Sequence, residues 1–213
     1  MGIISAIGNN VAENYQSLIN GKKGISRVSK IKTNHVNDIM VGEITFTNAE
    51  LEQQLHLSSD NNYSRTALLG AIAAKQALEN ANVTDINTYK TGLVSATSVG
   101  GMDMTERYYY DYLENKATQK YIEGHHAGDS TQKIAEQLGI EQSLVTTIST
   151  ACSSAANAIM FGARLIKSGQ LDRVVVGGAD CLSKFTINGF KTLMILSDTY
   201  NTPFDENRKG LNL

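Results

Sequence analysis

The sequence is poor in the residues and segments that mark several large classes of protein. It contains two cysteines in 213 residues, no Cys-x-x-Cys pair, and a single proline, Pro203. So few cysteines argue against a disulfide framework and favour a reducing compartment. No apolar run is long enough to span a bilayer, and the short apolar start lacks the basic residues of a signal peptide. These absences predict a cytoplasmic protein without a membrane partner.

The charges are nearly balanced and give no strong electrostatic signature. Nineteen basic and 21 acidic side chains leave a net charge of −2. Such a balance does not imply a nucleic acid or a membrane surface as a partner. The chain is 41% hydrophobic, so at this length it can bury a substantial core, and we expect one domain. Internal repeats, low-complexity tracts and Pro/Ser-rich linkers are also lacking.

The hydrophobic pattern alternates between strands and helices in the second half of the chain. Apolar, β-branched runs at 92–97, 145–150 and 173–180 predict strands. Apolar residues at helical spacing over 129–138 and 152–167 predict two helices between those strands. The strand at 145–150, the helix at 152–167 and the strand at 173–180 form a βαβ crossover, which requires a parallel sheet covered by helices. We therefore expect an α/β fold.

The first third of the chain carries weaker signals. Residues 9–20 are typical of a short helix that ends before Gly21, and residues 40–46 are a possible strand. Ser64 is a good cap for a stronger helix, whose small and apolar residues share one face. The residues on that face are Ala67, Ala71, Ala74 and Leu78.

Cys152 lies where the central strand gives way to a helix. The strand residues precede it, and the positions after it recur on one face of a helix that ends before Gly169. Amide N–H groups and the helix dipole at such an amino end favour a thiolate. The same N–H groups could hold the oxyanion formed when a thioester carbonyl is attacked. The spacing alone is compatible with two roles for Cys152, a nucleophile or a buried structural cysteine. The positions that share the helix face are 152, 155, 156, 159, 163 and 166.

Other polar and reactive residues have simpler interpretations. Cys181 follows a strand without a helix amino end behind it, so we interpret it as structural. The adjacent His125 and His126 point apart on regular structure and lack an Asp/Glu/Cys cluster, so we expect no metal. The tyrosines of 108–112 favour a packing or interface surface over a cofactor site. The glycine pair Gly100–Gly101, like Gly177–Gly178, favours tight turns or close packing over phosphate binding, so we expect no cofactor.

Several ordered motifs carry a resemblance to one family. Three segments are similar in order and spacing to motifs of the β-ketoacyl-acyl carrier protein synthases. They are Ser149-Thr-Ala-Cys152-Ser-Ser, Val174-Val-Val-Gly-Gly-Ala-Asp180 and Pro203-Phe-Asp205-Glu-Asn-Arg208-Lys-Gly210. These are condensing enzymes of the thiolase-like superfamily. The turn Gly2-Ile-Ile-Ser-Ala-Ile-Gly8 and the loop Ser98-Val-Gly-Gly101 extend the resemblance to nearly the whole chain.

The resemblance implies a fold, a reaction and partners. The family has two similar α/β halves in a five-layered α-β-α-β-α core with a mixed, mainly parallel sheet, and its members usually form homodimers. Cys152 matches the nucleophile, which takes an acyl group from acyl carrier protein. The enzyme then decarboxylates malonyl-acyl carrier protein, and the carbanion attacks the acyl-cysteine to give a 3-oxoacyl chain in fatty acid biosynthesis. By position, Val99 and Phe190 would line or gate the acyl pocket.

The sequence also departs from the family pattern. The family uses two histidines from its second half, whereas all four histidines here precede Cys152: His35, His56, His125 and His126. We therefore interpret residues 1–213 as the N-terminal half of a synthase, without the first strand, and expect it not to condense thioesters alone. One alternative is a ketosynthase of an aryl-polyene or polyketide-type pathway. Another is a non-condensing partner subunit, although those usually replace the cysteine.

Overall fold

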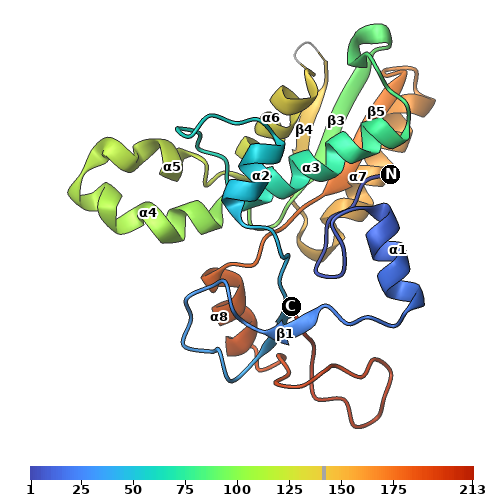
Figure 1. The fold of residues 1–213 in the computed structure, drawn as a ribbon. Helices are drawn as coiled ribbons and strands as arrows, with labels where there is room; N and C mark the ends of the chain where they lie inside the picture. The colour runs from blue at the N-terminus through green and yellow to red at the C-terminus, as the bar shows by residue number, and fades with distance from the viewer. Residues whose placement is uncertain (141–142) are drawn as a thin grey trace. The chain divides into compact units, whose positions relative to one another are not determined.

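The chain is divided into two compact units. The computed structural model describes residues 1–140 and 143–213 (Figure 1). Unit 1 contains residues 1–2 and 47–181, and unit 2 contains residues 3–46 and 182–213. Among the described residues, no helix combines the length and the hydropathy that crossing a membrane requires.

Unit 1 is built on a parallel sheet of three strands. The strands β3 (Thr91–Ala96), β4 (Val145–Ile148) and β5 (Arg173–Gly178) lie in the order β4-β3-β5. Leu93 is opposite Val145 of β4 on one side and Val175 of β5 on the other. Every residue of β3 is buried, because neighbours pair with both of its edges. The predicted α/β fold with a parallel sheet is confirmed.

The helix α7 (Ser154–Lys167) covers one face of this sheet. Its buried residues Ala158 and Leu165 pack with Val94 and Ala96 of β3. A Cβ atom on Gly162 would lie 2.4 Å from Val176 Cγ1, so a larger residue has no room there. Close contact between this helix and the sheet therefore depends on that glycine.

The positions of α7 that were predicted to share a face do so, and that face is exposed. The contact with the sheet uses the neighbouring stripe of Ser154, Ala158, Gly162 and Leu165 instead. Small residues on both stripes gave the same helical period, so the sequence pattern could not tell which stripe packs on β3. The exposed positions are Ala155, Ala156, Ile159, Ala163 and Ile166, and Cys152 is exposed just before the helix begins.

Two helices cover the opposite face of the sheet. The helix α3 (Arg65–Asn80) begins as predicted at Ser64, whose Oγ accepts a hydrogen bond from Ala67 N at 3.2 Å. The helix α6 (Ala127–Leu138) ends at Gly139, which adopts the left-handed conformation with φ of 70°. Glycine is favoured there because it has no Cβ to clash. Both predicted helices are confirmed.

Shorter helices complete unit 1. The helix α2 (Asn48–Gln54) starts with a capping box formed by Thr47 and Glu50. Between β3 and α6 lie α4 (Met102–Glu114) and α5 (Gln119–Glu123), which extend away from the sheet in Figure 1. The rings of Tyr108 and Tyr121 stack with centroids 4.2 Å apart, so part of the tyrosine-rich segment serves packing.

Unit 2 combines segments from both ends of the chain. It contains α1 (Val11–Ile19), the antiparallel pair β1 (Ile25–Arg27) and β2 (Met40–Gly42), and α8 (Lys184–Thr192). The strand expected over 40–46 is therefore realised in its first three residues. The core of this unit consists of Val28, Ile39, Val41 and Ile187.

Candidate active site

Cys152 lies in the turn between β4 and α7. Residues Ala151–Ser153 form one turn of 3₁₀ helix, and α7 begins at the next residue, Ser154. Cys152 is exposed to solvent. The predicted strand-to-helix turn is confirmed, with the cysteine one short turn ahead of the α-helix. In the described structure, no side chain caps the amino end of α7, which follows this turn directly.

The residue before Cys152 has an unusual backbone conformation. Ala151 has a φ of 54°, in the left-handed region that L-residues other than glycine rarely occupy. Such a conformation costs on the order of 1 kcal/mol and persists only where surrounding contacts hold it. The backbone at Ala151 therefore redirects the chain from the strand into the exposed cysteine turn.

Hydroxyl groups hold this turn in place. Ser154 Oγ donates a hydrogen bond to Ala151 O at 2.7 Å and accepts one from Thr150 N at 2.8 Å. Ser153 Oγ donates to Thr150 O at 2.8 Å, and Asn157 Nδ2 donates to Thr150 Oγ1 at 2.8 Å. These bonds offset the cost of the left-handed residue. The turn is thus fixed on the side that faces α7.

A second loop meets the cysteine turn at the carboxyl edge of the sheet. The residues after β3, from Thr97 to Gly100, follow the strand that pairs directly with β4. Ser98 Oγ donates a hydrogen bond to Ala151 O at 3.2 Å. The two loops are therefore in direct contact, and half-buried Val99 is the next residue along the chain. Ligand sites in open parallel sheets lie at this edge.

The loop after β3 is itself held by the carboxylate of Asp180, which follows β5 in the chain. Asp180 Oδ1 accepts hydrogen bonds from Thr97 Oγ1 at 2.5 Å, Ser98 N at 2.9 Å and Val99 N at 3.3 Å. Sequence reasoning placed Asp180 at a strand end and assigned it no role. Its partners lie more than 80 residues away in the chain, and only the parallel pairing of β3 with β5 brings them together.

The second cysteine is in the opposite environment from Cys152. Cys181 is 5% exposed, and its sulfur accepts a hydrogen bond from Thr66 Oγ1 at 3.4 Å. Burial raises the pKa of the Cys181 thiol to about 12. Burial also raises the pKa of Asp103, whose Oδ2 accepts a hydrogen bond from Arg65 N at 3.0 Å. The interpretation of Cys181 as a structural residue is supported by this burial.

Phe190, the other residue expected at the acyl pocket, belongs to unit 2. It is half-buried near the end of α8, whose Ile187 is fully buried in the core of that unit. Of the three residues expected at the site, the structure brings the segments of Cys152 and Val99 together through the contact of Ser98 with Ala151. The role of Phe190 stays a prediction.

The neighbouring histidines lie in the turn before α6, not on regular structure, and their rings do not point apart as expected. His125 Nδ1 lies 2.9 Å from Thr105 Oγ1, and the rings of His125 and His126 meet edge to face with centroids 6.4 Å apart. Over residues 1–140 and 143–213, no three His, Cys, Asp or Glu side chains gather in a way that could hold a metal ion. The glycine pair beside them serves close packing, because a Cβ on Gly101 would overlap the carbonyl of Gly124.

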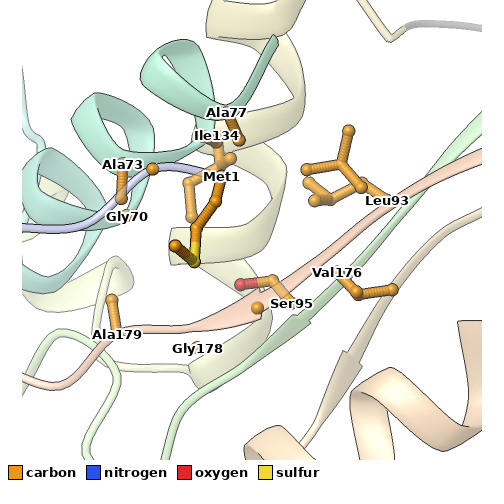
Figure 2. A pocket seen from close by; sticks show the side chains of 14 residues that line it. Met1, Gly70, Ala73, Ala77, Leu93, Ser95, Ile134, Val176, Gly178 and Ala179 are labelled. Carbon is orange, nitrogen blue, oxygen red and sulfur yellow. The ribbon is translucent and has the colours of Figure 1, made fainter. Parts of the chain in front are cut away.

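A cavity lies on the sheet face opposite α7. It has a volume of about 330 Å³ and is lined mainly by small residues of α3 and the sheet, together with Met1 (Figure 2). Leu93 and Ile134 supply its larger apolar surface, and Ser95 supplies a hydroxyl. None of its lining side chains is titratable, so this cavity lacks groups for acid, base or nucleophilic chemistry.

Comparison with known proteins gives a consistent result. The family model described as "Beta-ketoacyl synthase, N-terminal domain" matches residues 1–213. The chain is 23% identical over 221 residues to 3-oxoacyl-[acyl-carrier-protein] synthase 2 of Staphylococcus aureus, covering 99% of this chain and 53% of that protein. The enzyme of the same name from Vibrio cholerae is 26% identical over 225 residues, with 100% and 54% covered. The chain thus spans about half the length of these relatives.

Solved structures show the same fold. The ishigamide ketosynthase/chain length factor superposes with a TM-score of 0.87 at 23% identity, covering 98% of this chain and 53% of the other. A β-ketoacyl synthase from Burkholderia phymatum gives a TM-score of 0.77 at 19% identity, with 99% and 54% covered. A type II polyketide ketosynthase in complex with its acyl-carrier protein gives 0.73 at 22% identity, with 99% and 53% covered.

Proposed function

This chain belongs to the β-ketoacyl synthase family, and on that premise we propose that Cys152 is the nucleophile that accepts an acyl group from acyl carrier protein. The observation that carries the proposal is the position of Cys152, an exposed thiol in the turn that leads into the amino end of α7. The match to the family model spans the chain, so the cysteine turn lies within the matched region.

The surroundings of Cys152 suit attack on a thioester. The thiolate is the reactive form of cysteine, and the exposed Cys152 is accessible to a thioester carried by a partner protein. Attack on the thioester carbonyl gives a tetrahedral oxyanion, which the backbone N–H of Cys152 would help to stabilise. Collapse of this intermediate releases the thiolate of the carrier and leaves the acyl group on Cys152 Sγ. Covalent catalysis of this kind divides one acyl transfer into two steps.

The whole protein would then catalyse a decarboxylative condensation. Acyl-Cys152 would be attacked by the carbanion formed from malonyl-acyl carrier protein, which gives a 3-oxoacyl thioester. The partner in this proposal is acyl carrier protein, and one similar solved structure is a complex of a ketosynthase with its acyl-carrier protein. Fatty acid biosynthesis is the proposed pathway, since the curated relatives are 3-oxoacyl-[acyl-carrier-protein] synthases. Assembly as a homodimer and a cytoplasmic location stay predictions.

A ketosynthase of a polyketide or polyene pathway is the second candidate. The superposition on an ishigamide ketosynthase/chain length factor favours it. A non-condensing partner subunit fits less well, because such subunits usually replace the nucleophile and this chain retains Cys152. The acyl pocket separates the first two candidates, and Val99 with Phe190 would shape it.

The proposal is tested by acylating the protein and locating the acyl group. The protein is incubated with butanoyl- and palmitoyl-acyl carrier protein, and intact and peptide masses are measured. We expect the mass of one acyl group on the peptide that contains Cys152. The acyl group should be released by hydroxylamine, as a thioester is.

Two cysteine variants serve as controls. Cys152→Ala should abolish acylation, whereas Cys181→Ala should leave it unchanged, because Cys181 is 5% exposed. Acyl groups on another residue, or a folded protein that is not acylated at all, would overturn the proposed role of Cys152. Preference between the short and the long chain then measures which chain length the pocket accepts.

A further inference from the structure

The carboxylate of Asp180 binds the loop after β3 and takes no part in the pairing of the strands. The pairing of β5 with β3 continues without it, because Ala179 N donates a hydrogen bond to Ala96 O at 3.0 Å. Beyond that point, the Asp180 side chain crosses to the neighbouring strand end. Its Oδ1 accepts the three hydrogen bonds from Thr97, Ser98 and Val99 described above.

These bonds determine the shape of the loop that carries Val99. Two consecutive backbone N–H groups, of Ser98 and Val99, point at one carboxylate oxygen, which is a strong, charge-assisted arrangement. Thr97 Oγ1 donates to the same oxygen and accepts from Gly100 N at 3.0 Å. Gly100 can close the loop because it has a φ of 54°. The direction of the Val99 side chain therefore depends on Asp180.

The same loop reaches the residue before the nucleophile. Ser98 Oγ donates to Ala151 O at 3.2 Å, and the same oxygen also accepts from Ser154 Oγ. Ala151 is the left-handed residue whose conformation needs such support. Asp180 fixes the Ser98 backbone, and Ser98 holds Ala151. One carboxylate thus influences both the loop of Val99 and the turn of Cys152.

We propose that Asp180 is a positioning residue that sets the acyl-pocket loop and, through Ser98, the orientation of Cys152. This inference rests on the proposed function, in which Cys152 is acylated and Val99 lines the acyl pocket. Displacement of a reacting group by about 1 Å can reduce a rate by roughly a hundredfold. Loss of the Asp180 carboxylate should therefore reduce the rate of acylation and alter the preference between acyl chains.

The chain offers a matched control for this test. Asp172 precedes β5, and its Oδ2 accepts a hydrogen bond from Lys90 N at 3.0 Å, just before β3. Asp172 and Asp180 therefore connect the same two strands at opposite ends. Only Asp180 lies at the end where Cys152 is found. A general loss of sheet stability should affect Asp172→Ala and Asp180→Ala alike.

The experiment compares four variants in the protein that carries this chain. Rates of Cys152 acylation are measured with butanoyl- and palmitoyl-acyl carrier protein, beside melting temperatures. We expect Asp180→Ala to lower the rate by about tenfold and to change the ratio of the two rates by at least about threefold. Asp180→Asn should restore most of the rate, because its amide oxygen still accepts hydrogen bonds. Asp172→Ala should leave both quantities within about twofold of the parent protein.

Ser98→Ala separates the two effects of Asp180. It removes the hydroxyl that contacts Ala151 and leaves the backbone bonds to Asp180 in place, so it should lower both rates without changing their ratio. If Asp180→Ala does not fold, Ser98→Ala and Asp180→Asn carry the test. Unchanged acylation in Ser98→Ala would then overturn the link to Cys152.

The outcomes also separate this inference from the proposed function. Equal losses in Asp180→Ala and Asp172→Ala, with equal falls in melting temperature, would show a structural role and overturn the inference alone. If the parent protein is not acylated, the proposed function fails. The inference is then decided by the rate at which iodoacetamide alkylates Cys152, which Asp180→Ala should change and Asp172→Ala should not. Alkylation that is equal in these two variants overturns it.

Discussion

The hydroxyl of Thr66 donates a hydrogen bond to the sulfur of Cys181 across 3.4 Å, in the interior of unit 1. This bond joins the first turn of α3 to the residue that follows Asp180. Burial raises the pKa of Cys181 and keeps its thiol neutral, although the bond from Thr66 opposes this rise, whereas Cys152 is exposed. The chain thus carries one cysteine suited to packing and one suited to reaction.

The two cysteines should differ strongly in alkylation. At about pH 8, a thiol with a pKa of about 12 is ionised in roughly one molecule in ten thousand, and Cys181 is also shielded. We expect iodoacetamide to modify Cys152 at least about a hundredfold faster, as measured by peptide mass spectrometry over time. Equal alkylation rates of the two cysteines in the folded protein would contradict this. In urea the protein is unfolded, and the two rates should then be equal, which serves as the control.

Cys181 should also make the protein less stable at alkaline pH. Above the usual pKa of a thiol, the unfolded chain releases this proton, whereas the folded protein keeps it up to about pH 12. The free energy of unfolding should therefore fall as the pH rises, with a contribution of up to about 1.4 kcal/mol per pH unit. Urea unfolding at a series of pH values should show a weaker fall in Cys181→Ala.

The exposed cysteine provides the comparison for this alkaline effect. Cys152→Ala removes a cysteine from an exposed position and leaves the buried Cys181 in place, so it controls for the loss of a thiol as such. The idea is wrong if Cys181→Ala and Cys152→Ala show the same dependence on pH.

The left-handed backbone of Ala151 predicts opposite effects of two substitutions. Ala151→Gly should keep or raise the melting temperature, because glycine adopts a φ of 54° without strain. Ala151→Val should cost about 1–3 kcal/mol of stability and reduce acylation, because a β-branched residue is strained there. Ala163→Val, on the exposed face of α7, is the matched control and should change acylation little. Full acylation in Ala151→Val would contradict the assignment.

Two helical glycines should respond to alanine in opposite directions. A Cβ on Gly162 of α7 would lie 2.4 Å from Val176, whereas one on Gly189 of α8 would meet nothing within 4 Å. Gly162→Ala should cost about 1–3 kcal/mol through overpacking. Gly189→Ala should stabilise its helix by about 0.5–1 kcal/mol. Hydrogen exchange in α7 and α8 measures each effect locally, and a stabilising Gly162→Ala would show that the sheet gives way.

Local chemistry made much of unit 1 predictable from the sequence. The cap at Ser64 and the left-handed Gly139 are determined by neighbours within a few residues, so the ends of α3 and α6 were predicted well. The β-branched run before Cys152 likewise located β4 and the cysteine turn. The resemblance to the condensing enzymes located the expected nucleophile.

The rest depends on pairings between distant parts of the chain. The contacts of Asp180 arise because β3 and β5 are adjacent, and no local pattern specifies which strands pair. The face of α7 that packs was ambiguous because small residues lie on both stripes, and the close approach of Gly162 to Val176 decides it. The antiparallel pair β1–β2 was seen only as a possible strand, since each strand has three residues.

Unit 2 is built from two segments that lie far apart in the sequence, and this affects the order in which the units fold during synthesis. Residues 47–181 of unit 1 are continuous and can fold on the ribosome once they have emerged, whereas residues 3–46 must wait for residues 182–213. The core contact of Ile39 with Ile187 closes a loop that contains most of the chain, which makes it slow. Residues 3–46 thus remain exposed to chaperones and proteases until residues 182–213 have been synthesised.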